Sequence, residues 1–409
     1  MRLLRPGKSF YPLLIIAFSL LGLIIVGCEF EEPTSIWDLP DDPDATTTPV
    51  VTNVEPADWN MAGIGVMRII GSNFSATADS NVVFFNDTRA EIVSASNAVI
   101  TIKTPLLVGD SLKIKVARLG AYLFSSPVYY RILPSVVSYG TLLASELPAA
   151  ITVDSDENVY VSLQSNILRK IAPDGILEDY DATFFQSDGM KVGPGGLVYA
   201  TWNLRKRGRV SYFDTTGVQT DWVAFGKEAY DLDFDQDSSL WVALATDLVR
   251  VKPDGSQSTM DTYSYDLSSV RIYDGYVYVM ETDASTGAQK LWRSAIQGDG
   301  SLGTKQLVLD FSSIDKFTGV TINCFTFSSS GDIYFATDAA TSALIVYYAA
   351  EDIFEYFYPG LIKPPITYFG WGTDSYLYAS KPTTGAPQIL KIDVRLERVK
   401  QYSAPYYGR

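Results

Sequence analysis

The chain has 409 residues, of which 47% are apolar, 13% aromatic and 19% charged, a composition that supports large cores and excludes a disordered protein. The formal net charge is −15, so we expect the surface to repel nucleic acid and anionic lipid headgroups. Histidine is absent, which excludes Ser-His-Asp and Cys-His catalysis and nearly all zinc, copper and non-haem iron sites. We therefore predict no catalytic residues, no metal site and no cofactor.

The first 27 residues have the order of a secretion signal. Three cations, Arg2, Arg5 and Lys8, precede an apolar run over residues 11–26. A spanning helix needs about 20 apolar residues with charges on both sides, and this run is shorter and is followed by acids. We predict a signal peptide over residues 1–27. Cleavage of this signal peptide would remove three cations and no acids, and would change the formal charge of the chain from −15 to −18.

The end of this segment, Ile25-Val26-Gly27-Cys28, resembles the lipobox of bacterial lipoproteins, in which the cysteine is lipidated and becomes the mature N-terminus. The resemblance implies lipidation of Cys28 and attachment to the outer membrane, on the cell surface or the periplasmic face. A signal anchor with an incidental cysteine is the alternative. The acids after Cys28 resemble the surface-export signal of Bacteroidetes lipoproteins, although an acidic tether alone would look the same.

Residues 28–48 are rich in Pro, Asp and Thr and should form an extended tether. The only cysteines are Cys28 and Cys324, so a lipidated Cys28 leaves no intramolecular disulfide. Cys324 lies in a predicted inner strand, where we expect a buried and inert thiol.

Residues 49–132 contain short alternating apolar segments separated by turn residues, a spacing typical of a β-sandwich. Three motifs in this stretch, Asn53-Val54-Glu55-Pro56, Ile70-Gly71-Ser72-Asn73-Phe74 and Ile102-Lys103-Thr104-Pro105, resemble an IPT/TIG domain. The resemblance implies an immunoglobulin-like fold that acts as a spacer or interaction module without catalytic residues. We expect Gly71 and Asn73 in a turn with unusual backbone angles and Phe74 in the core.

Six copies of one pattern follow in residues 133–409, and each reads as an extended segment, a tight turn and a second segment centred on an aromatic. The aromatics are Tyr160, Tyr199, Trp241, Tyr278, Tyr334 and Tyr378. A period of roughly 40 to 55 residues is that of a four-stranded propeller blade. The sequence therefore predicts an all-β protein, with an immunoglobulin-like sandwich followed by a six-bladed β-propeller.

Residues 168–175 and 248–255 are nearly the same strand and turn, and with the repeated aromatics they resemble NHL-type propellers. A ring must close, and residues 135–143 beside residues 399–403 would serve. The repeated aromatics are expected to pack between blades. A glycan platform is the alternative for these rings.

Two acidic turns imitate the start of a calcium loop, one at Asp154, Asp156 and Asn158 and the other at Asp235 and Asp237. Neither continues with the glycine and terminal glutamate of that loop, so we expect turn chemistry.

Long loops at one face of the propeller are predicted to form the binding site, because loops on a rigid scaffold collect binding residues. Trp202, Tyr230 and Tyr368 would offer stacking surfaces and Arg205 and Arg207 would supply cations. The remaining candidates are polar: Asp188, Asp231, Asp283 and Asn323.

Three classes of function fit these features. The first is a non-catalytic binding or scaffold lipoprotein whose propeller grips a glycan or an envelope protein. The second is an enzyme that resembles the propeller gluconolactonases, in which Glu, Asp and Asn residues hold a divalent cation. The set of cation ligands is incomplete here, because the matching positions hold Ala150, Asp231, Asn323 and Tyr368, with Asp188 nearby. The third is an architectural part of an envelope assembly, which a wide apolar patch on one flank would favour.

Overall fold

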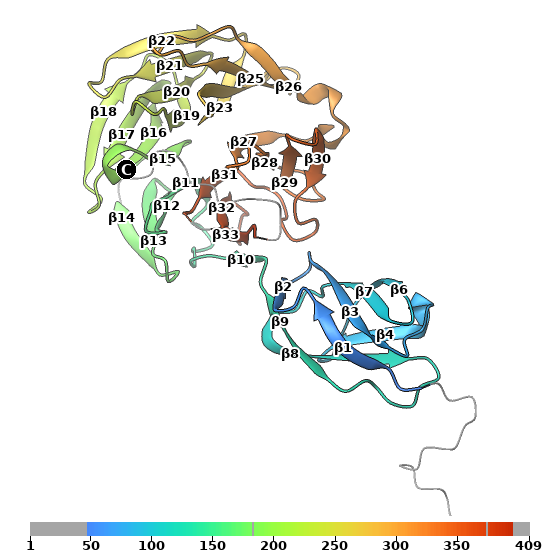
Figure 1. Ribbon diagram of the computed structural model, residues 1–409. Helices are drawn as coiled ribbons and strands as arrows, with labels where there is room; N and C mark the ends of the chain where they lie inside the picture. Colours follow the sequence, from blue (N-terminus) through green and yellow to red (C-terminus); the bar gives the residue numbers. More distant parts are fainter. Residues whose placement is uncertain (1–46, 182–183, 374, 396–409) are drawn as a thin grey trace, which may run out of the picture.

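The computed structural model describes residues 47–181, 184–373 and 375–395, which form two all-β units (Figure 1). The first unit holds strands β1–β9 and the second holds strands β10–β33, as the sequence predicts. Within the described residues, no helix is long and apolar enough to cross a bilayer. The predicted signal peptide, Cys28, most of the tether and residues 399–403 lie outside the described residues.

The N-terminal unit is a sandwich of two sheets, with strand orders β1-β3-β7-β6 and β2-β9-β8-β4-β5. Alternate residues of β3 and β8 are buried and exposed, because each strand has one face on the core and one in water. The strands are β1 (Val50–Glu55), β2 (Trp59–Met61), β3 (Val66–Ser72), β4 (Asn81–Phe85), β5 (Thr88–Arg89), β6 (Ile92–Ala95), β7 (Val99–Lys103), β8 (Gly109–Arg118) and β9 (Val128–Leu133); the 3₁₀ helix η1 (Ala78–Ser80) precedes β4.

The turn after β3 confirms most of what its sequence predicts. Asn73 has a left-handed φ of 61°, and its side-chain amide donates to the carbonyl of Thr48 at 3.0 Å. Phe74 is buried in the core. The reason for glycine at Gly71 differs from the expected one: its φ is not left-handed, but a Cβ there would meet the carbonyl oxygen of Val50 at 1.8 Å.

The second unit contains six four-stranded sheets in the described residues, each one a propeller blade. In chain order the blades are β11–β14, β15–β18, β19–β22, β23–β26, β27–β30, and β31–β33 with β10. The bounds of their strands are β10 (Val136–Ser138), β11 (Pro148–Val153), β12 (Val159–Leu163), β13 (Ile167–Ile171), β14 (Leu177–Asp181), β15 (Met190–Val192), β16 (Val198–Leu204), β17 (Arg207–Phe213), β18 (Gln219–Ala224), β19 (Ala229–Phe234), β20 (Leu240–Leu244), β21 (Asp247–Val251), β22 (Gln257–Thr262), β23 (Asp266–Tyr273), β24 (Tyr276–Thr282), β25 (Gln289–Ala295), β26 (Gln306–Asp310), β27 (Ile322–Phe327), β28 (Ile333–Thr337), β29 (Leu344–Tyr348), β30 (Ile353–Tyr356), β31 (Tyr368–Trp371), β32 (Tyr376–Lys381) and β33 (Gln388–Asp393). Three further 3₁₀ helices are η2 (Pro194–Gly196), η3 (Phe311–Ser313) and η4 (Asp315–Phe317).

The innermost strands contact one another around a closed ring, in the order β11, β15, β19, β23, β27, β31 and back to β11. The ring is closed by β10, which comes from the N-terminal side of the propeller and pairs antiparallel with β33 as the outer strand of the sixth blade. The expected closing segment near residue 135 is thus confirmed. Its partner in the structure is Gln388–Asp393, whereas we had expected residues 399–403.

The six repeated aromatics are buried in the second strands of the blades. Several of them pack across the boundary between neighbouring blades. Tyr199 contacts Phe234 with ring centroids 4.8 Å apart, and Tyr278 contacts Phe327 at 4.7 Å. Their role is therefore packing between blades.

The acidic turns are held by hydrogen bonds within the chain. The Asp235 carboxylate accepts from the backbone amides of Asp237 and Ser239 at 3.0 and 2.9 Å, and from the Trp241 indole at 2.9 Å. Asp154 makes the equivalent bonds in the first blade, including one at 2.9 Å from the hydroxyl of the repeated aromatic there. These contacts show the turn chemistry that the sequence predicts.

Candidate ligand-binding site at the propeller mouth

β-bulges shape the mouth of the propeller. In β19, Ala229 pairs with Leu244 and Asp231 pairs with Ala243, which leaves Tyr230 as an extra residue. The same shift leaves Ser268 extra in β23 and Asn323 extra in β27. A bulge re-aims the side chain that it carries.

These bulge residues line a hollow of ≈ 410 Å³. The hollow lies over the beginnings of the innermost strands of the third, fourth and fifth blades, and its size is in the range of small-molecule sites. Its lining residues are Asp188, Tyr230, Asp266, Leu267, Ser268, Thr282, Ala284, Gln289, Thr321, Ile322 and Asn323. Three predicted site residues, Asp188, Tyr230 and Asn323, are thus brought together.

Gln289 is a buried polar residue that fixes one wall of the hollow. Its side-chain amide donates to the carbonyl of Ile322 at 2.8 Å and to the Thr282 hydroxyl at 3.1 Å, and its oxygen accepts from the Ile322 amide at 2.8 Å. These bonds tie the fourth blade to the fifth. A second hollow, of ≈ 480 Å³, shares Gln289 and Thr321 with the first and continues over residues 286–288, 311–312 and 317–320.

Asp188 faces this hollow from the second blade. The Asn203 amide donates to its carboxylate at 3.1 Å and also donates to the carbonyl of Ala229 at 3.0 Å. Desolvation by the surrounding walls raises the pKa of Asp188 above its usual value, and the Asn203 bond opposes that rise. The carboxylate is therefore positioned as an acceptor toward the hollow.

Tyr230 supplies an aromatic surface with a hydroxyl group. Its hydroxyl donates to Glu228 at 3.3 Å. Burial, followed by the charges of Glu228 and Asp266, raises the pKa of Tyr230 to about 12. The phenol therefore remains protonated at neutral pH, and the surroundings of the hollow are acidic.

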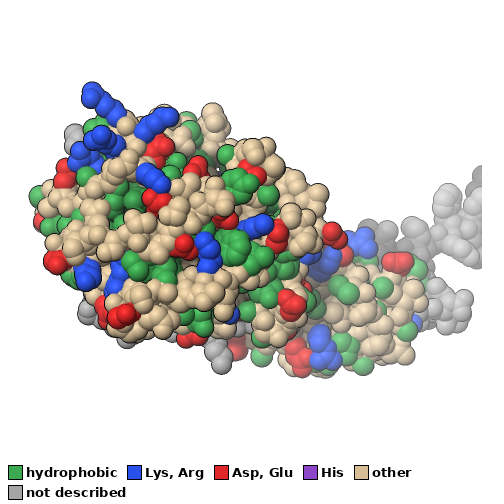
Figure 2. Space-filling view, turned by 90° about the horizontal axis from the view of Figure 1, so that it is seen from above, with side chains coloured by type: hydrophobic (Ala, Val, Ile, Leu, Met, Phe, Trp, Pro, Cys, Tyr) green, Lys and Arg blue, Asp and Glu red, His purple; other side chains and the backbone are tan. Residues whose placement is uncertain are grey.

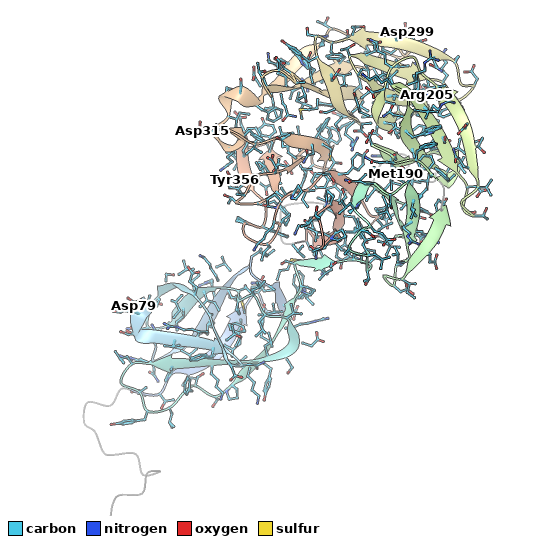
Figure 3. All side chains as sticks on the ribbon, turned by 180° about the vertical axis from the view of Figure 1, so that it is seen from behind. Asp79, Met190, Arg205, Asp299, Asp315 and Tyr356 are labelled. Atoms are coloured by element: carbon cyan, nitrogen blue, oxygen red, sulfur yellow. The ribbon has the colours of Figure 1, made fainter. Side chains whose placement is uncertain are left out.

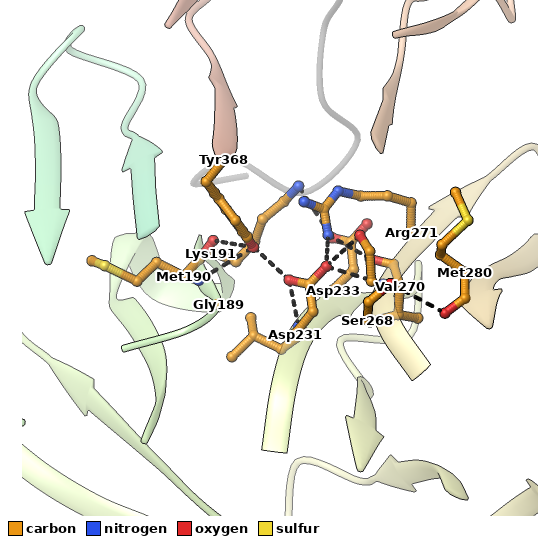
Figure 4. A network of polar contacts seen from close by, with 12 residues as sticks. Gly189, Met190, Lys191, Asp231, Asp233, Ser268, Val270, Arg271, Met280 and Tyr368 are labelled. Carbon is orange, nitrogen blue, oxygen red and sulfur yellow. Dashed lines mark hydrogen bonds and ion pairs between the residues drawn. The ribbon is translucent and has the colours of Figure 1, made fainter. Parts of the chain in front are cut away.

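Asp231 does not face the hollow as predicted. It is 1% exposed and forms an ion pair with Arg271 at 2.5 Å, while Ser269 donates to it at 2.7 Å and Tyr368 donates to its second oxygen (Figure 4). Burial is the largest effect on the pKa of Arg271 and disfavours its charge, but the combined attraction of Asp231, Tyr368 and Asp233 outweighs it and holds the arginine pKa well above its usual value. This group is a buried cross-link between blades.

Cys324 is buried as expected, and it lies close enough to this cross-link for the charges of Arg271 and Asp231 to affect the pKa of its thiol. Burial raises the pKa of the thiol to about 12, with Arg271 opposing the rise. The predicted burial of Cys324 is thus confirmed, and a thiol with a raised pKa stays protonated and is a poor nucleophile at neutral pH, as expected for an inert cysteine.

The expectation that Trp202 and Tyr368 offer open stacking surfaces is wrong. Both side chains are 5% exposed. Trp202 lies within β16, where its indole donates to Ser211 at 2.8 Å and Phe185 stacks on its ring at 4.7 Å. Tyr368 is held by Asp231, and burial together with that carboxylate raises its pKa well above the usual range.

Asp283 is also occupied within the protein. Its two oxygens accept hydrogen bonds from the amide and hydroxyl of Ser285 at 2.9 and 2.6 Å and from the hydroxyl of Thr286 at 2.7 Å. These bonds, with Ser285 first, lower the pKa of Asp283 to about 2. Asp283 therefore shapes the β24–β25 loop, although it was predicted as an acceptor for ligand.

Arg205 and Arg207 are exposed as predicted, but they lie at the β16–β17 hairpin of the second blade and outside the hollow's lining. Figure 3 marks the position of Arg205 on the propeller. The sequence predicts a long loop over residues 201–209, but β16 ends at Leu204 and β17 begins at Arg207, and the two residues between them, Arg205 and Lys206, both have positive φ in a tight turn. On the face shown in Figure 2, basic side chains gather at one edge of the propeller.

The residues that the sequence matches to the cation ligands of gluconolactonases come from two different positions of the innermost strands. Asn323 is a bulge residue equivalent to Tyr230, whereas Asp231 and Tyr368 lie one residue further along, opposite Ala243 and Ser380. In the described residues, no three His, Cys, Asp or Glu side chains gather as metal ligands would. The polar lining residues that sequence analysis missed are Asp266, Ser268, Thr282, Gln289 and Thr321.

A signal for one missed residue was present. Asp188, Tyr230 and Asn323 each precede the repeated aromatic of their blade by 11 residues, and Ser268 precedes Tyr278 by 10. Counting back 11 residues from Tyr278 reaches Leu267, so the spacing leads to within one residue of Ser268 but does not select it.

Residues 49–132 match the family model for the IPT/TIG domain, so this module is present, as its sequence motifs indicate. The solved structures that resemble the chain are propeller-type proteins, and the molecule is a β-propeller protein with an IPT/TIG domain. No curated protein matches the chain.

Two of the similar structures are auxiliary nutrient binding proteins. The protein from Bacteroides thetaiotaomicron has 11% identity and a TM-score of 0.54, and the match covers 85% of this chain and 97% of that one. The protein from Bacteroides ovatus has 11% identity and a TM-score of 0.52, with 85% and 98% covered. A gluconolactonase from Xanthomonas campestris has 13% identity and a TM-score of 0.50, with 76% and 97% covered. At these identities the likeness shows the fold alone.

Proposed function

We propose that this protein is a non-catalytic binding lipoprotein of the cell envelope. Cys28 carries the lipid, the tether and the IPT/TIG domain lift the propeller from the outer membrane, and the mouth hollow holds a hydroxyl-rich ligand such as a segment of a neutral glycan. Two auxiliary nutrient binding proteins with the same overall fold support a binding role.

The observation that carries the proposal is the hollow itself. It combines the half-buried ring of Tyr230 with the carboxylates of Asp188 and Asp266, the hydroxyl of Ser268 and the amide of Asn323. An apolar surface with a few convergent polar groups is the usual form of a small-ligand site. Sugar hydroxyls donate well to carboxylates, whereas the same carboxylates repel an anionic ligand.

A lactonase-like mechanism is disfavoured by the partner of Asp231. That enzyme class would use an inner carboxylate to hold a divalent cation. Here the Arg271 guanidinium already neutralises the Asp231 carboxylate at 2.5 Å and is itself buried. Replacing it with a cation would require the cross-link between blades to break.

An architectural role would require a wide apolar patch on the flank of the propeller. The large apolar side chains that the propeller exposes come from different blades and loops, among them Ile176, Val218 and Leu307. Exposed apolar residues that come singly from separate elements are ordinary on protein surfaces.

Filling the hollow tests the proposal. Neutral and polyuronate polysaccharides would be screened by affinity electrophoresis with the wild-type protein and with Ala284→Trp, whose exposed side chain lines the hollow. We expect retention by a neutral polysaccharide and at least about a tenfold loss of affinity in the variant, or about 1.4 kcal/mol. The matched control is Ala350→Trp, in an exposed turn between β29 and β30.

Equal loss in both variants would point to a folding defect, which a comparison of melting temperatures separates from loss of binding. Unchanged binding by Ala284→Trp would place the ligand outside the hollow and overturn the proposal. Release of shortened products would show that the protein is an enzyme.

A further inference from the structure

The IPT/TIG domain exposes an apolar loop between β8 and β9. Leu119, Tyr122, Leu123 and Phe124 are 77%, 42%, 55% and 49% exposed, within six consecutive residues. A single exposed apolar residue is ordinary, whereas a cluster of this density marks a contact surface.

A basic and aromatic sheet face continues this loop. On the outer face of the sheet, Lys113 lies opposite Tyr129, which is 57% exposed, and Lys115 lies opposite Phe84. Phe84 in turn lies opposite Arg89. The ring of Phe124 meets that of Phe84 at 6.1 Å, so the loop and the sheet form one surface.

The cations on this surface are available for a partner. Lys113, Lys115 and Arg89 are exposed, and none forms an ion pair with another described residue. By contrast, the cations of the opposite sheet are paired, Arg68 with Glu55 at 2.6 Å and Lys103 with Glu91 at 2.8 Å. Among the described residues of the IPT/TIG domain, Arg118 also forms no ion pair, and the other three cations without one, Arg89, Lys113 and Lys115, lie on the face that carries the aromatic residues.

The apolar loop lies beside the point where the N-terminal segment joins the domain. The carbonyl of Thr48 accepts from Asn73, whose own carbonyl accepts from Arg118 at 3.3 Å, and Arg118 directly precedes the loop. β9 then runs from this loop toward the propeller, so the loop and Thr48 share the end of the sandwich remote from the propeller (Figure 1).

From this arrangement we propose that the surface formed by residues 119–124, Lys113, Lys115, Phe84 and Tyr129 rests on an anionic lipid bilayer. Aromatic and aliphatic side chains enter the headgroup region while neighbouring lysines attract anionic lipids. The proposal rests on the lipoprotein function proposed above, because a tether of about 20 residues from Cys28 would end beside this loop.

The whole-chain charge of −15 predicts repulsion from anionic lipids, but it is unevenly distributed. Residues 49–132 contain seven Lys and Arg against six Asp and Glu, so the acidic excess belongs to the rest of the chain. At physiological salt, charges further away than about 8 Å are largely screened. The local basic face therefore governs a contact at the membrane-proximal end.

Vesicle flotation tests this contact without the lipid anchor. The chain from residue 28 with Cys28→Ser keeps the tether and both folded units but cannot be acylated. We expect it to float with phosphatidylcholine vesicles that contain phosphatidylglycerol, and to bind pure phosphatidylcholine vesicles at least about fivefold more weakly, since each lysine contributes about 1 kcal/mol near an anionic surface.

Two variants of that chain separate the apolar contribution to vesicle binding from the electrostatic one. Leu123→Ser with Phe124→Ser should weaken binding at least about tenfold, because two half-exposed apolar side chains no longer enter the bilayer. Lys113→Gln with Lys115→Gln should remove the preference for phosphatidylglycerol. The matched controls on the opposite sheet, Val93→Ser and Lys103→Gln, should bind like the parent.

Absence of flotation by the parent chain, or equal losses in the control variants, would overturn the proposal. Self-association of the parent that the Leu123→Ser and Phe124→Ser changes abolish, without vesicle binding, would instead assign the surface to a second copy. Acyl labelling of the full-length protein, compared with Cys28→Ala, reports on the anchor separately. Labelling without flotation of the unacylated chain would leave the lipoprotein function standing and reject only the bilayer contact.

Discussion

At the scale of single residues, the buried ion pair of Asp231 and Arg271 is the contact whose disruption we expect to lower the stability of the fold most. Arg271→Met would leave a carboxylate in the interior with its charge uncompensated, and we expect the propeller to lose about 3 to 5 kcal/mol of unfolding free energy. Asp231→Asn combined with Arg271→Met should recover much of that loss, since neither charge remains. Urea unfolding of the single and double variants measures the coupling.

The exposed pair of Lys103 and Glu91 is the control for this cycle. Lys103→Met should cost no more than about 1 kcal/mol, because water already solvates both groups. An Arg271→Met variant that loses no more than Lys103→Met would contradict the view of Asp231 as a structural cross-link.

Residue-scale predictions from the sequence succeeded where burial follows from the strand pattern. The burial of Cys324 and the core position of Phe74 were predictable because each residue lies in or next to an alternating apolar segment. Trp202 and Tyr368 were predicted to be exposed because the sequence suggested loops at these positions, whereas Trp202 lies within β16 and Tyr368 begins β31. Asp283 was misread because its hydrogen bonds to Ser285 and Thr286 form only in the folded turn.

At the scale of elements, the strand β10 holds the propeller ring closed. Val137 pairs with Lys391 at the centre of this three-residue strand. Val137→Pro removes a backbone donor and should lower the stability of the propeller by about 1 to 3 kcal/mol. Val137→Ala, which keeps the backbone donor, is the control, and thermal unfolding with limited proteolysis of the sixth blade reports the effect. Equal stability of the two variants would mean that β10 is dispensable for closure.

The six blades were predictable because each carries the same aromatic and turn pattern, but the bulges were not. An extra residue in β19, β23 or β27 leaves the apolar alternation intact on either side of it. Only the pairing with the neighbouring strand reveals that Tyr230, Ser268 and Asn323 are extra. For this reason the sequence located the mouth but selected only some of its side chains.

At the scale of the whole molecule, the two ends of the IPT/TIG domain face different surroundings. One end contacts the propeller, where Ser135 donates to the carbonyl of Ala62 at 2.9 Å and the guanidinium of Arg395 lies 5.0 Å from the Trp59 ring. The other end carries the apolar loop of residues 119–124 beside Thr48. A bilayer at that end would leave the propeller extended away from the membrane and accessible to a ligand.

The central claim is that the bulge-lined hollow binds the ligand and leaves it unaltered. Hydrogen exchange measured by mass spectrometry, with and without the polysaccharide that the wild-type protein retains, maps the contact directly. We predict slower exchange in residues 264–269, 282–289 and 320–323, no change in the IPT/TIG domain, and recovery of the polysaccharide at its original length. Protection confined to the propeller flank or to the IPT/TIG domain, or a shortened polysaccharide, would contradict the account.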